Sequence, residues 1–186
     1  MKKLYFLAAA VLLLSVSAFA QDKPTKDYSG VWTLDVSKSK LDERARIESM
    51  TMTVAQIGKD LKVTTETKRM APPADAAGGP GGGGGRGGGR GFGGGDGTNT
   101  YSLDGKETTT TRETQMGSIP VKHTAMLDQG RVRISSSSSF SGPNGEVTMT
   151  TKEVWSMSDD GKTLTVERES TSPRGTSAST MVFTKK

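Results

Sequence analysis

The feature that most constrains this chain is a two-residue alternation of apolar and polar side chains, which runs through most of its length. Thr, Ser, Lys and Glu fill the positions between the apolar ones. A period of two, rich in Thr and Val, is typical of strands that bury one face. The clearest groups are Trp32, Leu34 and Val36; Met50, Met52 and Val54; Leu61 and Val63; Tyr101 and Leu103; Val121, Ala125 and Leu127; Val132 and Ile134; Val147 and Met149; Trp155 and Met157; Leu164 and Val166; and Met181 and Phe183.

Short turn signals separate these groups. Asp104-Gly105, Asn144-Gly145 and Asp160-Gly161 supply the positive φ that tight hairpins require. We therefore predict an all-β domain, an antiparallel up-and-down meander of about ten strands. Such a meander is expected to close into a small barrel, which removes exposed strand edges; an open sandwich of two sheets is the alternative. Only Ser37–Ile47 has the composition for a helix, of one or two turns, capped by Ser39.

Residues 1–20 have the features of a signal peptide. Lys2 and Lys3 precede an apolar run from Leu4 to Val16, and a small-x-small cleavage site ends at Ala20. The run is shorter than the roughly 20 apolar residues that a membrane span needs, so we predict cleavage after Ala20 and no transmembrane segment in the mature protein. An uncleaved anchor is the alternative. The expected location is periplasmic or extracellular, and a chain without Cys relies on burial rather than on disulfides.

Residues 71–97 stand apart in composition. Fifteen of the chain's 24 Gly residues lie between Gly78 and Gly97. Gly loses much conformational entropy on ordering and has no side chain to bury, so we predict a flexible loop inside a single domain of residues 21–186. Arg86 and Arg90 leave two interpretations, a solvated tether or a contact with anionic lipid or polysaccharide. The net charge of +5 is mild, and we predict no nucleic-acid partner.

The opening strand carries a family resemblance. Gly30-Val31-Trp32 at the start of an all-β domain resembles the calycin group, the lipocalins and fatty-acid-binding proteins. In those families the Trp closes one end of the barrel and often packs under a basic side chain of a late strand, for which Arg168 is the candidate here. The chain is also similar to exported, lipocalin-like bacterial proteins of unknown function. Those proteins pair the Ser29-Gly30-x-Trp32 start with a late pattern that reads here as Trp155, Asp160, Gly161, Lys162 and Leu164.

The resemblance implies the barrel but not a ligand. The last strand, residues 180–185, lacks the Arg-x-Tyr pair with which fatty-acid-binding proteins bind a carboxylate.

Catalytic signals are missing from the sequence. There is a single His and no Cys, no Gly-x-Ser-x-Gly elbow, and no carboxylate cluster spaced for a metal. We therefore predict that the protein is not an enzyme and holds no metal or cofactor.

Three polar residues lie on the apolar parity of their strands and are expected to point inward. His123 follows the parity of Val121, Glu153 that of Trp155, and Arg168 that of Val166. Buried charges are costly unless they are paired. One interpretation is a structural network in which Glu153 pairs with Arg168 and His123 bonds nearby; a second is a patch that orients a ligand's head group; a third is a bulge that turns these residues to solvent.

The remaining candidates line the same expected interior. The inward Met residues suit either an ordinary core or an adaptable pocket, whereas small hydroxyl side chains do not fill a core and suggest room for water or ligand. The predicted ligand-binding residues are His123, Glu153, Arg168, Trp32, Ser136 and Trp155.

These observations favour a non-enzymatic, exported binding module for a small apolar or amphipathic ligand, similar to a lipocalin. The alternative is a structural or interaction protein of the cell envelope, with a barrel filled by its own side chains and the Gly-rich loop as its working part. The expected partner is a small lipid-like molecule. No sequence feature points to a particular oligomeric state.

Overall fold

A computed structural model describes residues 26–42, 45–71, 96–114, 117–142 and 145–186. The predicted signal peptide and residues 72–95 of the Gly-rich segment lie outside this part of the chain. Gly97 already belongs to a strand, so the prediction of a loop through residue 97 ran too far. Within the described ranges, no helix is long and apolar enough to cross a membrane.

The described residues form ten strands in a single antiparallel sheet, which confirms the predicted all-β meander. The strands are β1 (Gly30–Leu34), β2 (Ile47–Ile57), β3 (Asp60–Arg69), β4 (Gly97–Ser102), β5 (Asp104–Thr114), β6 (Gly117–Asp128), β7 (Arg131–Gly142), β8 (Gly145–Met157), β9 (Thr163–Ser172) and β10 (Gly175–Lys185).

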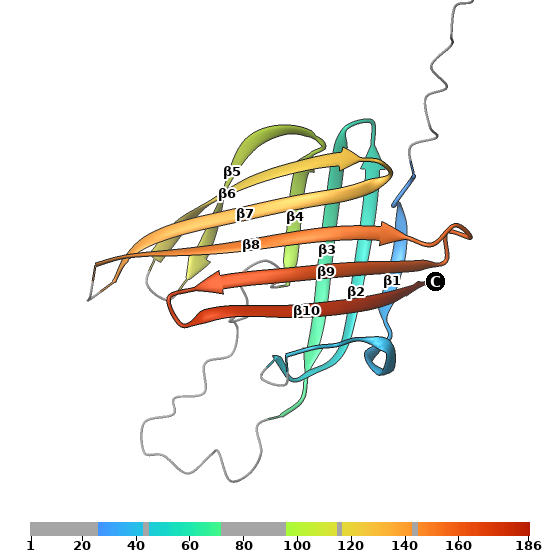
Figure 1. Ribbon diagram of the computed structural model, residues 1–186, viewed down its shortest axis with the longest axis horizontal. Helices are drawn as coiled ribbons and strands as arrows, with labels where there is room; N and C mark the ends of the chain where they lie inside the picture. The colour runs from blue at the N-terminus through green and yellow to red at the C-terminus, as the bar shows by residue number, and fades with distance from the viewer. Residues whose placement is uncertain (1–25, 43–44, 72–95, 115–116, 143–144) are drawn as a thin grey trace, which may run out of the picture.

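The sheet curls into a nearly closed barrel. Its order is β4-β3-β2-β1-β10-β9-β8-β7-β6-β5, so the first and last strands pair and β4 and β5 form its two edges. β1 to β4 run steeply across β7 to β10, and the two groups enclose the interior (Figure 1). Because β1 hydrogen-bonds to both β2 and β10, the two layers belong to one continuous sheet. The open sandwich of two separate sheets is therefore not formed.

The connection between β1 and β2 departs from the sequence prediction. Instead of a helix within Ser37–Ile47 capped by Ser39, the chain forms a three-residue 3-10 helix, η1 (Val36–Lys38). Asp35 is its N-cap, since Asp35 Oδ1 accepts hydrogen bonds from the backbone N–H groups of Ser37 and Lys38. Ser39 lies at the other end of η1, where its hydroxyl accepts a hydrogen bond from the Val182 backbone N–H and fastens this connection to β10.

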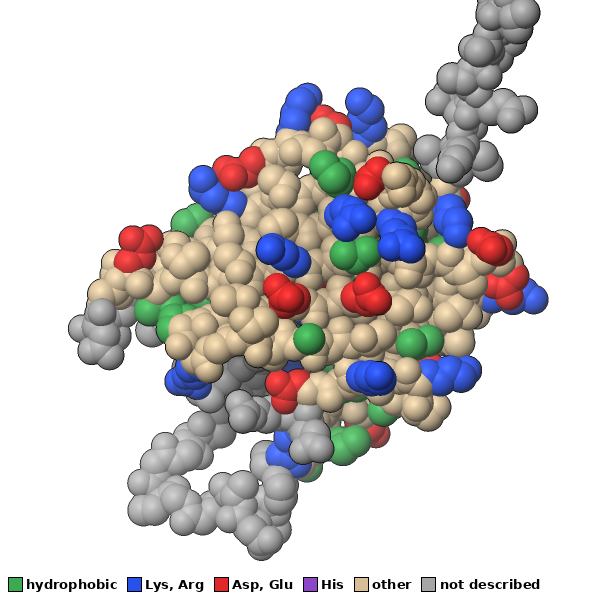
Figure 2. All heavy atoms as spheres, in the orientation of Figure 1, with side chains coloured by type: hydrophobic (Ala, Val, Ile, Leu, Met, Phe, Trp, Pro, Cys, Tyr) green, Lys and Arg blue, Asp and Glu red, His purple; other side chains and the backbone are tan. Residues whose placement is uncertain are grey.

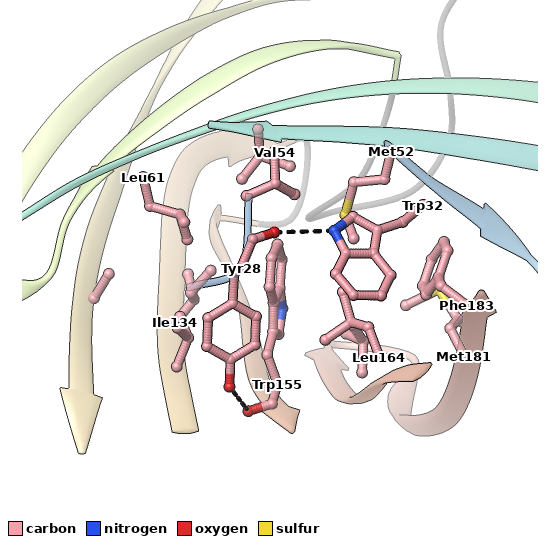
Figure 3. Close-up of a cluster of buried hydrophobic side chains, with 14 of the residues drawn as sticks. Tyr28, Trp32, Met52, Val54, Leu61, Ile134, Trp155, Leu164, Met181 and Phe183 are labelled. Atoms are coloured by element: carbon pink, nitrogen blue, oxygen red, sulfur yellow. Dashed lines mark hydrogen bonds between the residues drawn. The ribbon is translucent and has the colours of Figure 1, made fainter. Parts of the chain in front are cut away.

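One end of the barrel is closed by a dense apolar core around Tyr28 and Trp32, both fully buried (Figure 3). The Tyr28 hydroxyl donates to the backbone carbonyl of Gly130 at 2.8 Å and lies 3.2 Å from that of Trp155. The Trp32 indole N–H donates to the Tyr28 carbonyl at 3.0 Å. Tyr28, just before the first strand, and Trp32, within it, thus close this end, which we call the closed end.

The basic partner of Trp32 is Lys185, and the assignment of that role to Arg168 was wrong. The Lys185 ammonium lies 5.2 Å from the centre of the Trp32 ring, a cation–π contact. Gly30 makes this contact possible, because a Cβ at that position would lie 2.5 Å from Lys185 Cε. The Gly-x-Trp motif therefore has a physical reason: the Gly leaves room for the cation that covers the Trp.

The outer face is polar and carries charges of both signs. Lys and Arg side chains are interspersed with Asp and Glu over the face seen in Figure 2. On the strands, Lys152 stands opposite Glu169 in the register between β8 and β9. This face therefore has no large area of a single charge.

We predict that Gly30→Ala lowers the free energy of unfolding by about 1 kcal/mol more than Gly97→Ala does. Both glycines have a φ unfavourable for Ala, +142° and +134°, but nothing lies within 4 Å of a Cβ at Gly97. The matched pair therefore separates the loss of the Lys185 contact from backbone strain. Urea denaturation of the two variants measures the difference, and equal losses would contradict the role given to Gly30.

Candidate functional site

The cross-strand register aligns a row of polar side chains across the inner face of six strands. Its members, which we call the hydroxyl row, are Thr108 of β5, His123 of β6, Ser136 of β7, Thr151 of β8, Ser170 of β9 and Ser177 of β10. His123 and Thr151 are buried, whereas Ser177 is exposed. The row thus leads from the interior to solvent, and it arises because each strand keeps its inward parity across the register.

His123 is the centre of the buried part of this row. Its Nε2 lies 2.8 Å from Thr110 Oγ1 and its Nδ1 lies 2.8 Å from Ser136 Oγ. Tyr101 packs edge-on against the imidazole, with ring centroids 5.4 Å apart. Burial lowers the pKa of His123, and the positive charge of Arg112 lowers it further against a smaller opposing effect of Glu153. The imidazole is therefore neutral at pH 7.

A buried ion pair lies between this row and the core. Glu153 and Arg168 face each other in the register of β8 and β9. Arg168 Nε and Nη2 each lie 2.8 Å from Glu153 Oε1, and the Trp155 indole N–H donates to Oε2 at 2.8 Å. Both carboxylate oxygens thus have a donor, which offsets the cost of burying the charge. The predicted Glu153–Arg168 pair is confirmed, and His123 contacts hydroxyl groups instead of joining it.

The space beside this pair is small. A cavity of about 20 Å³ touches Thr65 of β3, Trp155 and both members of the ion pair, and this is room for about one water molecule. Met50 and Met181 line it from the core side. These Met residues therefore fill the closed half of the barrel, as ordinary core residues do.

Beyond the hydroxyl row the inner wall becomes apolar again. We call this second area the apolar rim; it comprises Ile119, Val121, Phe140, Val147 and Met149 of β6, β7 and β8. Ile119 and Val121 are 8% and 2% exposed, and the other three are partly buried. In the described part of the chain, none of the five belongs to the core cluster or packs against it. The interior thus has three zones: a packed core, a polar belt and an apolar rim.

The sheet splits beside the rim. The ladder between β6 and β7 runs from Asp128 to Lys122 and then stops, although both strands continue. The stop coincides with Pro120, which has no N–H to donate. Ser138 is the first β7 residue beyond the last pair. It is only 4% exposed, and its hydroxyl has no hydrogen-bond partner among the described residues.

The structure brings the predicted site residues together in two groups and leaves one apart. His123 and Ser136 share the hydroxyl row, and Glu153, Arg168 and Trp155 form the ion-pair group. Trp32 belongs to the closed end, where the Tyr28 carbonyl and the Lys185 ammonium contact it. No group of three or more His, Asp or Glu side chains that would hold a metal occurs among the described residues.

Sequence reasoning missed four residues that shape these groups. Tyr101 and Thr110 contact His123, and Tyr28 and Lys185 close the barrel around Trp32. Lys185 carried a readable signal, since it shares the parity of Met181 and Phe183. Tyr28 lies before the first strand, and Tyr101 reaches His123 from a strand that is not its neighbour in the sheet. Thr110 is only 13 positions from His123, on the preceding strand.

We predict that His123→Gln makes stability less dependent on pH between 7 and 5. A His whose folded pKa is depressed binds fewer protons folded than unfolded, so its stabilising effect is present above the unfolded pKa of about 6.5 and is lost as pH falls below it. Denaturant midpoints of the wild-type protein and the variant at pH 7 and pH 5 measure the difference in pH dependence. The two proteins share all their carboxylates, so the contribution of those groups is the same in both. Parallel losses in the two proteins would show that His123 does not titrate as proposed.

We predict that Arg168→Met lowers the free energy of unfolding by about 2 kcal/mol, since it leaves Glu153 buried without its cation. Adding Glu153→Gln should recover most of that loss. Lys122→Met is the matched control: its partner Glu107 has a side chain 53% exposed, and exposed pairs contribute little. Chemical denaturation of the four proteins tests this. No recovery in the double variant would mean that Arg168 acts through packing and not through charge.

Comparisons with known proteins agree with the barrel. No family model matches the chain, and no curated protein matches it. Among solved structures it is similar to an abundant heat soluble protein of Ramazzottius varieornatus, with 10% identity over 85% of this chain and 94% of that one and a TM-score of 0.50. Two further similar structures have lower TM-scores. The zebrafish ileal bile acid-binding protein in complex with cholic acid has 16% identity over 86% of this chain and 98% of that one, at 0.48. The Manduca sexta fatty-acid-binding protein has 16% identity over 85% and 99%, at 0.42.

At these identities the comparisons concern the fold alone. Together with the strand order, the likeness to the Ramazzottius protein identifies the architecture of this chain as a calycin-like β-barrel.

Proposed function

We propose that the protein is a non-enzymatic binding module that takes a small amphipathic ligand in the far half of its barrel, beyond the ion pair. The observation that carries the proposal is the zoning of the inner wall, where a belt of small polar side chains lies next to an apolar rim outside the core. A wall with one polar and one apolar zone is complementary to a molecule with one polar and one apolar part.

The two zones have separate tasks in this proposal. The hydroxyl row orients the polar group of the ligand by hydrogen bonds, and the rim covers its chain. Burial of the chain supplies most of the affinity, at about 0.8 kcal/mol per CH₂ group. In this proposal the ligand enters where the ladder between β6 and β7 ends, with Ile119 and Val121 on one side and Phe140 on the other.

Export remains part of the proposal. Its support is the charged start, the apolar run and the small-x-small site within residues 1–20, which lie outside the described residues. An exported binding module would meet its ligand in the periplasm or outside the cell. The absence of Cys makes the described fold independent of the redox state of either compartment.

A structural or interaction protein of the envelope is the second candidate. It is favoured by the cavity beside Glu153 and Arg168, whose volume of about 20 Å³ leaves the core half without room for a ligand. The two functions differ in one measurable property. A filled barrel binds neither a neutral nor an anionic amphiphile, whereas a binding module binds at least one of the two.

We predict that the protein without residues 1–20 binds monolaurin or lauric acid with one-to-one stoichiometry in isothermal titration calorimetry. The paired substitution Phe140→Ser and Val147→Ser, at facing rim positions, should weaken that binding at least about tenfold, the equivalent of losing about two buried CH₂ contacts. Met126→Ser on the outer face, at a side chain 45% exposed, is the matched control and should bind normally. The absence of heat and of a bound mass in native mass spectrometry, for both ligands, would exclude the binding module.

A further inference from the structure

We infer that the site selects an amphiphile whose polar group is uncharged and carries hydroxyls, and that it discriminates against carboxylates. The inference rests on the proposed function and names the ligand class of the same site. It follows from the ion pair and hydrogen bonds that the charged and polar groups of the inner wall already make with one another.

The cation that a carboxylate would seek is occupied. Both Arg168 Nε and Arg168 Nη2 lie 2.8 Å from Glu153 Oε1. A ligand carboxylate that took Arg168 would leave Glu153, which is 8% exposed, as a buried charge without a cation. Leaving a buried charge unpaired costs more than the new contact returns. A carboxylate that stayed beside the intact pair would lie close to the negative charge of Glu153.

Two other ionisable groups on this wall, His123 and Tyr101, offer no positive charge to an anion. His123 is neutral, since burial and the charge of Arg112 lower its pKa. Tyr101 keeps its proton, because burial and the charge of Glu153 raise its pKa far above its usual range. Arg112 is a second cation on this wall, facing Ile119 in the register, and it too has interactions of its own.

What the wall does offer is neutral hydrogen bonding. Ser136, Thr151 and Ser170 lie side by side in the register of β7, β8 and β9. Ser138 adds a hydroxyl that is nine-tenths buried and has no partner among the described residues. A buried hydroxyl without a partner is costly unless a ligand or water satisfies it. A ligand that both donates and accepts, as an alcohol does, matches this set best.

Calorimetry of the wild-type protein at pH 8 with three C12 ligands tests the inference. Monolaurin has two hydroxyls and no charge, lauric acid is ionised, and methyl laurate has neither hydroxyl nor charge. We expect monolaurin to bind at least about tenfold more tightly than either of the others. Laurate binding as tightly as monolaurin, or methyl laurate doing so, would overturn the inference while leaving the binding module intact. No binding by any of the three would overturn the proposed function itself.

Two variants with matched controls locate the selectivity. Glu153→Gln leaves the charge of Arg168 uncompensated and should raise laurate affinity at least threefold, whereas Glu167→Gln, an exposed position on the outer face of β9, should not. Ser138→Ala should weaken monolaurin by about threefold to tenfold with laurate unchanged and without loss of thermal stability. Ser139→Ala, on the exposed face of β7, should change neither affinity. If the ratio of monolaurin affinity to laurate affinity is unchanged in both Glu153→Gln and Ser138→Ala, the assigned contacts are contradicted, even where the wild-type protein is selective.

Discussion

The structure depends on a short strand that joins its two ends. β1 has five residues, yet it pairs with β2 on one side and with β10 on the other. Two contacts fix the position of its buried Trp32. The indole N–H donates to the Tyr28 carbonyl, and the ring lies under the Lys185 ammonium. Without β1 the sheet would divide into two, β2 to β4 and β5 to β10, with two more free edges and an exposed core. The barrel is therefore closed by contacts between the beginning and the end of the chain.

The polar belt and the closed core are two results of the same register. Because side chains alternate between the two faces of a sheet, a shift of one residue in any ladder would turn the inward set outward. In β8 the inward set contains both Trp155 of the core and Thr151 of the hydroxyl row, with Glu153 between them. The core fixes the register at one end of the strand, and the strand then carries that register to the polar residues. Packing at the closed end thus positions the site.

Much of the fold was predictable from the sequence, because a period of two is a local signal. The strands and the inward direction of His123, Glu153 and Arg168 follow from parity, and the antiparallel order follows from the short turns. The opposition of Glu153 and Arg168 was also predictable, since a short turn joins their strands. Two other partners were harder, because Lys185 reaches Trp32 from the last strand and Tyr101 reaches His123 from a strand that is not its neighbour in the sheet. The Asp35 cap was missed because a three-residue helix has no periodicity to detect.

The pairing of β1 with β10 also has a consequence for how the chain reaches its native state. Residues such as Thr33 and Thr184 lie opposite each other in the sheet although 151 positions separate them in sequence. Contacts of such long range are slow to form, because a large loop must close before they contribute any stability. Until the final strand has emerged from synthesis, the initial strand lacks one neighbour and the Trp lacks its cation. Closure of the barrel therefore waits until β10 is available, and until then β1 is joined to the rest of the sheet only through β2.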